Sequence, residues 1–213
     1  MKSKFSSIIF AILCGMFIAS CGSGGGSGKK IAKNDVLGDL PNVLYQKHFG
    51  DSVIDAKERE ALKNLKWTES DMKKGMKIKE KFKAEREKVD VKYDAEIKKV
   101  EEQLLGKDIP FEVEEGLGYK VNSFKITSIL KYGVIAEFEV ETTDVKVANI
   151  ERYSNKLVVQ SQNIDKNGNV LGETPHYIKL NGKEDGVKAT ETMLILAEKN
   201  YADFAKVKFV NSK

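Results

Sequence analysis

In the second half of the chain, apolar and polar residues alternate with a period of two. The clearest run spans residues 134–141, where every second side chain is apolar and three of the others are glutamates. This pattern is typical of a strand with one buried and one solvated face. Similar runs predict further strands at 111–113, 119–130, 156–164, 176–180, 190–197 and 205–210, with a weaker one at 145–150. Residues 109–213 are therefore expected to form an all-β domain.

Two local irregularities refine this expectation. The alternation slips at Asn122 and Ser123, which predicts a β-bulge in the second strand. Asp165 to Asn169 is rich in turn-forming residues and is expected to close a hairpin.

Residues 36–106 follow a helical pattern instead, with apolar residues three, four or seven positions apart. Pro41 suits the first turn of a short helix that is expected to end at Phe49 and Gly50. Ser52 to Asp55 resembles a capping box and predicts that a second helix begins there.

A third, long helix is predicted to begin after Thr68 and to end before Gly106. Its apolar positions form one narrow stripe: Met72, Met76, Phe82, Val89, Tyr93, Ile97, Val100 and Leu104. The opposite face is almost wholly Lys and Glu. Residues 36–106 are expected to form a helical hairpin, with the stripe packed inside the protein. The stripe also fits a sheet surface or a second protein.

The first 20 residues differ from both halves. Lys2 and Lys4 precede an uncharged stretch from Phe5 to Ile18, and small residues follow. This arrangement is typical of a secretory signal. The apolar stretch is shorter than the roughly 20 residues that span a bilayer.

The leader ends in Ile18, Ala19, Ser20 and Cys21, which resembles the lipobox of bacterial lipoprotein precursors. The resemblance implies removal of residues 1–20 and attachment of Cys21 to the membrane through acyl chains such as palmitate. Residues 22–28 consist only of Gly and Ser, and residues 21–35 are expected to form a flexible tether. Because the position after the lipidated cysteine is not acidic, the chain resembles lipoproteins of the outer membrane. Both the periplasmic face and the cell-surface face of that membrane are compatible with this sequence.

Composition narrows the functional classes. Cys14 leaves with the leader and Cys21 carries the lipid, so no thiol remains for a disulfide or a zinc site. Loss of Lys2 and Lys4 reduces the formal charge of +4 by two, to +2. A balance this small does not predict nucleic-acid binding.

The β half resembles an immunoglobulin-like or fibronectin-like sandwich, because about seven short strands follow one another without intervening helices. Residues 200–204 resemble the corner that precedes the final hairpin in such folds. The buried tryptophan and paired cysteines of antibody domains are absent, and Trp67 lies in the helical part. The predicted class is α+β, with the helical segment 36–106 followed by this sandwich.

Histidine and cysteine, which often supply catalytic or metal-binding side chains, are sparse. His48 and His176 are the only histidines and lie in different segments, so neither catalysis nor a cofactor is predicted. Asp165, Asn167 and Asn169 begin like a calcium loop, but the glycine and the closing glutamate are misplaced, which favours a simple turn. The three glutamates Glu137, Glu139 and Glu141 are spaced as on a solvated strand face.

These observations favour a lipid-anchored envelope protein whose β domain binds a protein or glycan without catalysis. One alternative is an envelope enzyme or enzyme inhibitor whose site has no linear motif. Another is a structural subunit that docks through its helical stripe.

Overall fold

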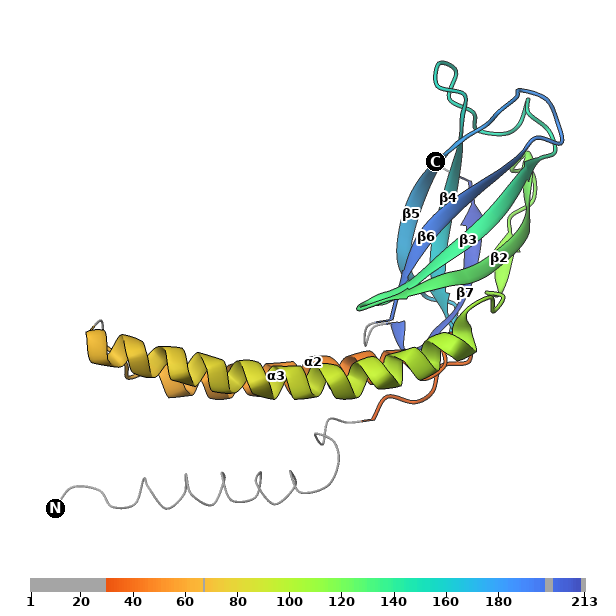
Figure 1. The fold of residues 1–213 in the computed structure, drawn as a ribbon. Helices are drawn as coiled ribbons and strands as arrows, with labels where there is room; N and C mark the ends of the chain where they lie inside the picture. Colours follow the sequence, from red (N-terminus) through yellow and green to blue (C-terminus); the bar gives the residue numbers. More distant parts are fainter. Residues whose placement is uncertain (1–29, 67, 198–200, 212–213) are drawn as a thin grey trace. The chain divides into compact units, whose positions relative to one another are not determined.

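The computed structural model describes residues 30–66, 68–197 and 201–211. Two helices, α2 (Leu40–Leu62) and α3 (Glu69–Leu104), precede seven strands, which confirms the expected α+β order (Figure 1). The chain divides into two compact units. The hairpin unit contains residues 46–90 of the two helices, and the β unit combines residues 31–45 with the chain from residue 91 onward.

Helix α2 is continuous, so the predicted end at Phe49 and Gly50 and the predicted new start at Ser52 are wrong. Ser52 is in mid-helix, and its Oγ donates to the carbonyl of His48, 2.8 Å away. A β-carbon at Gly50 would lie 3.3 Å from a methyl group of Val89. This glycine therefore lets the two helices approach closely instead of ending the first one.

Helix α3 begins and ends as the sequence predicts. The backbone nitrogen of Asp71 donates to Thr68 Oγ1 at 3.2 Å, which is an N-cap contact. Glu69 and Asp71 place negative charge in the first turn, where the helix dipole favours it. At the other end, Gly106 adopts a φ of 77°, the left-handed conformation that commonly ends a helix.

The hairpin unit pairs its helices in opposite directions. Lys47 Nζ lies 2.8 Å from Asp90 Oδ1, while Arg86 forms ion pairs with Asp55, at 2.7 Å, and with Glu58. Residue numbers rise on one helix as they fall on the other, so the expected antiparallel hairpin is confirmed within this unit.

The β unit contains two sheets (Figure 1). The strands are β1 (Phe111–Val113), β2 (Tyr119–Leu130), β3 (Gly133–Thr142), β4 (Lys156–Asp165), β5 (Val170–Lys179), β6 (Lys188–Leu196) and β7 (Phe204–Val210). One sheet has the order β2-β3-β6, and the other has the order β1-β7-β4-β5. Neighbouring strands are antiparallel except β1 and β7, which are parallel.

Comparison with the predicted strands gives two corrections. The weak strand predicted at 145–150 does not form, because these residues make a turn, with only Ile150 bridging to Leu157. Strand β5 begins at Val170, six residues before the predicted start. The predicted bulge is confirmed by a register shift between Val121 and Ser123, and a second shift follows Ile126.

Aromatic rings join the two sheets. The ring centroid of Phe138, on β3, lies 5.2 Å from that of Phe209, on β7, and the ring centroid of Phe124, on β2, lies 6.0 Å from that of Phe209. These three side chains are almost completely buried. The edge-on and tilted contacts are the favoured geometries for aromatic pairs. The sheets therefore form a sandwich-like core without any cross-link from cysteine.

The segment before α2 belongs to the β unit. The side chain of Asn34, within the last residues of the expected tether, is buried and uses its whole amide group. Its Nδ2 donates to the carbonyls of Ala202 and Phe204, both at 2.8 Å, and its Oδ1 accepts from the nitrogens of Val36 and Leu37. This one residue fastens the chain to the start of β7.

Candidate functional site

The predicted lipidation residue, Cys21, lies outside the described residues, as does the rest of the leader. Among the helices that are described, neither is long and apolar enough to cross a membrane. Lipid attachment at Cys21 therefore stays a prediction from the sequence.

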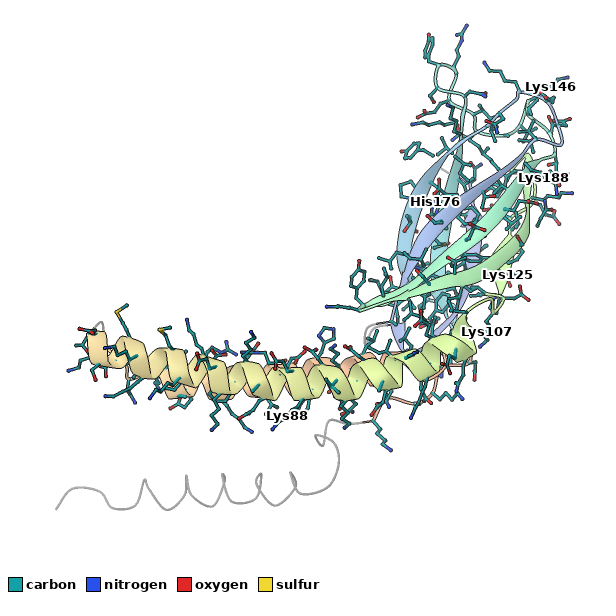
Figure 2. The ribbon with its side chains drawn as sticks, viewed as in Figure 1. Lys88, Lys107, Lys125, Lys146, His176 and Lys188 are labelled. Atoms are coloured by element: carbon teal, nitrogen blue, oxygen red, sulfur yellow. The ribbon has the colours of Figure 1, made fainter. Side chains whose placement is uncertain are left out.

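The two histidines lie in different units and differ in environment. His48 is exposed on α2, whereas His176 on β5 is buried, with its ring edge-on to Phe138 (Figure 2). His176 Nε2 lies 2.9 Å from Ser161 Oγ, which also contacts the carbonyl of Thr174 at 3.2 Å.

Burial lowers the pKa of His176 more than the carboxylate of Glu191 raises it. The imidazole is therefore neutral near pH 7. Because Ser161 is also buried, the pair lies in the core, away from any substrate in solution. Its hydrogen bonds satisfy polar groups between the sheets.

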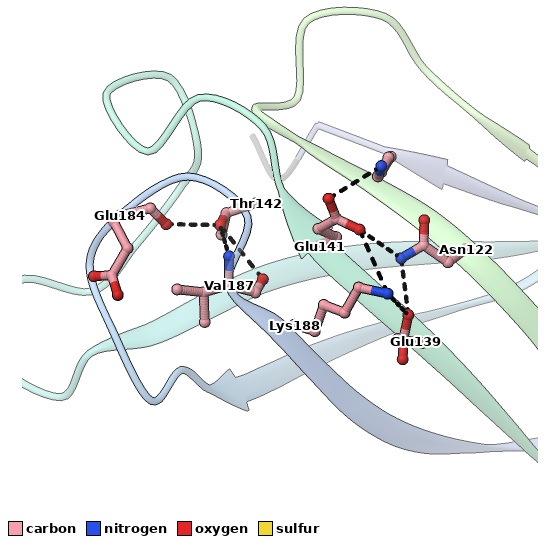
Figure 3. A network of polar contacts seen from close by, with 8 residues as sticks. Asn122, Glu139, Glu141, Thr142, Glu184, Val187 and Lys188 are labelled. Carbon is pink, nitrogen blue, oxygen red and sulfur yellow. Dashed lines mark hydrogen bonds and ion pairs between the residues drawn. The ribbon is translucent and has the colours of Figure 1, made fainter.

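The acidic strand face of β3 carries paired charges (Figure 3). Lys188 Nζ lies 3.1 Å from Glu139 Oε1, and Lys120 Nζ lies 3.1 Å from Glu141 Oε1. Asn122 donates to both carboxylates, at 2.8 and 2.9 Å. These bonds, led by those from Asn122, lower the pKa of Glu139 and of Glu141. Both groups are ionised at neutral pH, which suits a solvated face and not a proton donor.

The segment resembling a calcium loop is a hairpin turn between β4 and β5, as the sequence favours. Asp165 Oδ1 accepts from the backbone nitrogens of Asn167 and Asn169, both at 2.8 Å, and Asp165 Oδ2 accepts from Asn169 Nδ2. These bonds lower the pKa of Asp165. Across the described ranges, no group of three His, Cys, Asp or Glu side chains is placed to hold a metal ion.

The most distinctive surface is the loop between β3 and β4, residues 143–155, which we call the presenting loop. Its first residues are fixed to the β1–β2 connection, because the nitrogens of Thr143 and Asp144 both donate to the carbonyl of Gly118. Gly118 has a φ of 73°, and a β-carbon there would lie 2.4 Å from the nitrogen of Ala148. Only glycine permits this close approach.

The β5–β6 loop, residues 180–187, fixes the same region from the other side. Asp185 Oδ1 accepts from the nitrogen of Val145 at 2.9 Å. Thr142 Oγ1 contacts the carbonyl of Glu184 and accepts from the nitrogen of Val187 (Figure 3). These contacts join loops that are about 40 residues apart in the sequence.

The far end of the presenting loop is also fixed. Asn155 adopts a φ of 53°, a left-handed conformation that asparagine tolerates better than most residues. Its Nδ2 donates to the carbonyl of Leu180 at 2.8 Å, and the nitrogen of Leu180 donates back to the carbonyl of Asn155. The loop is thus connected at both ends to backbone that is itself ordered by the sheets.

Between these fixed ends the loop exposes apolar and aromatic groups. The side chain of Tyr153 is 96% exposed and Val147 is 54% exposed, while the guanidinium of Arg152 lies 5.9 Å from the Tyr153 ring. A solvated tyrosine on a loop whose two ends are fixed offers a large contact area with little loss of conformational entropy on binding. The arrangement is suited to recognition of a partner surface.

Sequence reasoning missed this site because Val145 and Val147 imitate the alternation of a strand. Asp144 is a signal that favours a turn, because its Oδ1 accepts from the nitrogen of Lys146, two residues on. The exposure of Tyr153 had no sequence signal.

Comparisons of the chain with protein-family models, with curated proteins and with solved structures find no match.

Proposed function

We propose that this protein is a lipid-anchored protein of the bacterial cell envelope, held through Cys21 and acting as a non-catalytic binding module. The support for the anchor is the order of the leader: two lysines, an uncharged run, small residues and then Cys21. Two or more acyl chains give durable attachment, because each buried methylene contributes about 0.8 kcal/mol. Gly22 supports placement in the outer membrane.

We also propose that the β unit is a variant of the immunoglobulin-like sandwich. If β2 to β7 correspond to strands A, B, C, C′, E and F, the two sheets have the orders A-B-E and C′-C-F, as in that fold. Strand β1 then occupies the place of strand G beside β7, and it runs parallel where G is antiparallel. Tyr201, just before β7, donates to the carbonyl of Leu171 at 3.4 Å and resembles the tyrosine of such corners.

Binding is proposed to occur through the presenting loop, and the observation that carries this proposal is the near-complete exposure of Tyr153 on a loop fixed at both ends. Aromatic anchors on preorganised loops commonly supply much of the energy of an interface. The partner is a protein or a glycan of the envelope.

The anchor is tested by metabolic labelling with a palmitate analogue. The wild-type chain should be labelled and retained in membranes, whereas Cys21→Ser should be unlabelled and remain at precursor size. A Cys21→Ser chain that was still labelled would refute lipidation at this residue.

The binding site is tested by photo-crosslinking in the native envelope, with the full chain carrying a photoreactive phenylalanine in place of Tyr153. The matched control carries it at Tyr132, which is 46% exposed in the turn at the other end of β3. We expect a discrete adduct from position 153 and none from position 132. The same adducts from both positions, or none from either, would refute binding through the presenting loop.

A further inference from the structure

The end of the helical hairpin has a concentration of positive charge that the rest of the chain does not share. Residues 63–83 contain eight lysines against three acidic residues, a net formal charge of +5, although the whole chain carries only +4. The eight are Lys63, Lys66, Lys73, Lys74, Lys77, Lys79, Lys81 and Lys83, and all are exposed. We call residues 63–83 the basic tip; all of them belong to the hairpin unit.

Two of the three acidic residues of the basic tip are already paired with neighbouring lysines. Glu69 pairs with Lys73 at 2.7 Å, and Asp71 pairs with Lys74 at 3.1 Å. Within the described part of the chain, the other five lysines of the tip form no ion pair: Lys66, Lys77, Lys79, Lys81 and Lys83. Their charge is therefore available to an external anion.

The same tip exposes apolar side chains. Met72 and Met76 begin the predicted apolar stripe of α3, yet they are 58% and 65% exposed, whereas Phe82, Tyr93, Val100 and Leu104 are buried. At a spacing of four residues the two methionines lie on one helix face. Yellow sulfur atoms project from the start of α3 in Figure 2. Packing within the protein thus covers most of the stripe from Phe82 onward but leaves its first two members in solvent.

We propose that the basic tip docks on an anionic phospholipid surface. Lysines close to such a surface are attracted to its phosphates, and flexible apolar side chains enter the interface between headgroups and acyl chains. A soluble polyanion would use the lysines alone, so the exposed methionines favour a bilayer. This inference concerns the hairpin unit and holds whether or not Cys21 is lipidated.

The second half of α3 supplies an internal control. From Ala84 to Glu102 the chain has five basic residues against seven acidic ones, a net formal charge of −2. Lys88, which is labelled in Figure 2, and Lys92, Lys98 and Lys99 are exposed on the same helix. Replacing these four removes equal charge from a region that is not basic overall. Val91, which is 73% exposed, is the matching apolar residue.

The experiment measures binding of the unlipidated chain from residue 21 onward, with Cys21→Ser, to vesicles. One vesicle set contains equal amounts of phosphatidylglycerol and phosphatidylcholine, and the other contains phosphatidylcholine only. Trp67 is the sole tryptophan and lies within the basic tip in the sequence, so its quenching by brominated acyl chains reports contact with the bilayer. We expect quenching with anionic vesicles only, and weaker binding as salt is raised.

Substitutions separate the two contributions. K77Q/K79Q/K81Q/K83Q should weaken binding at least a hundredfold, since each lysine contributes about fivefold near an anionic surface. K88Q/K92Q/K98Q/K99Q should weaken it far less. M72S/M76S should reduce both the affinity for anionic vesicles and the quenching of Trp67, whereas V91S should change neither. Circular dichroism should show intact helices in all four variants.

Three outcomes would overturn the proposal. The first is equal binding to both vesicle sets. The second is an equal loss of binding in the two lysine quadruple variants. The third is tight binding to inorganic polyphosphate that M72S/M76S does not weaken, combined with no quenching of Trp67 by anionic vesicles. That result would mean that the tip binds a soluble polyanion.

Discussion

The β unit and the hairpin unit depend on different forces. In the β unit, both sheets contribute large side chains to one core, where Phe124, Phe138 and Phe209 are almost fully buried. Among the described residues 46–90 of the hairpin unit, Ile54 and Phe82 are the only buried apolar side chains. Ion pairs connect its two helices instead, centred on Arg86.

This difference predicts which perturbations will change the stability of each unit. Burial of apolar surface is insensitive to modest salt, whereas partly exposed ion pairs are screened by it and contribute little each. Helices of this length also gain most of their stability from packing. We therefore expect the hairpin unit to open more readily than the β unit and to be the more sensitive of the two to salt.

The largest effect is expected from Phe138→Ala. This ring contacts Phe124, Phe209 and His176, so its loss leaves a cavity between the sheets and should destabilise the β unit by about 3–5 kcal/mol. Hydrogen exchange, followed by mass spectrometry across the full chain, should show faster exchange in β3, β4 and β7. The reciprocal variant Phe82→Ala should affect the hairpin unit instead. If either variant accelerated hydrogen exchange equally in both units, the two units would not be stabilised separately.

The strands of this core were largely predictable, because a period of two in residues 119–130 and 134–141 determines which side chains face inward. The end of α3 was predictable for a similar local reason, since Gly106 can adopt a positive φ. Helix α2 was not, because the effect of Gly50 depends on Val89, which approaches from the other helix. Local patterns cannot show a neighbour that is distant in the sequence.

The candidate site was even less predictable. The presenting loop is shaped by Gly118 and Asp185, which lie tens of residues away on two other loops. The pattern of Val145 and Val147 alone imitates a strand. The exposure of Tyr153 likewise follows from the path of the backbone, which the order of residues around it does not specify.

A moderate effect of pH should appear in the β unit. Because the pKa of His176 is lowered in the folded state, the unfolded chain takes up a proton first, at about pH 6.5. Stability is therefore greatest above that pH and falls as pH drops from 6.5 toward the folded pKa, by at most about 1.4 kcal/mol per pH unit. Urea denaturation at several pH values would measure this slope.

The control for this titration is His176→Gln, which keeps a polar side chain opposite Ser161 but cannot titrate. Its free energy of unfolding should be lower than that of the wild type near pH 7 and should depend less on pH between about pH 5 and 6.5. The carboxylates of Glu139, Glu141 and Asp165 remain ionised in this range because their pKa values are lowered. The same slope in both proteins would show that another group is responsible.

The smallest effect is expected in the hairpin unit, from Arg86→Met. The variant keeps the aliphatic part of the side chain but removes the ion pairs with Asp55 and Glu58, so amides of residues 46–66 should exchange about two- to fivefold faster. High salt should accelerate exchange in the wild-type hairpin by a similar factor and have less effect on the variant.

Lys206→Met, which removes the ion pair with Glu112 between β7 and β1, is the matched control. Because apolar burial dominates the β unit, this control should leave exchange in β4 and β7 unchanged; a response as large as that of the hairpin would mean that ion pairs are equally important in both units.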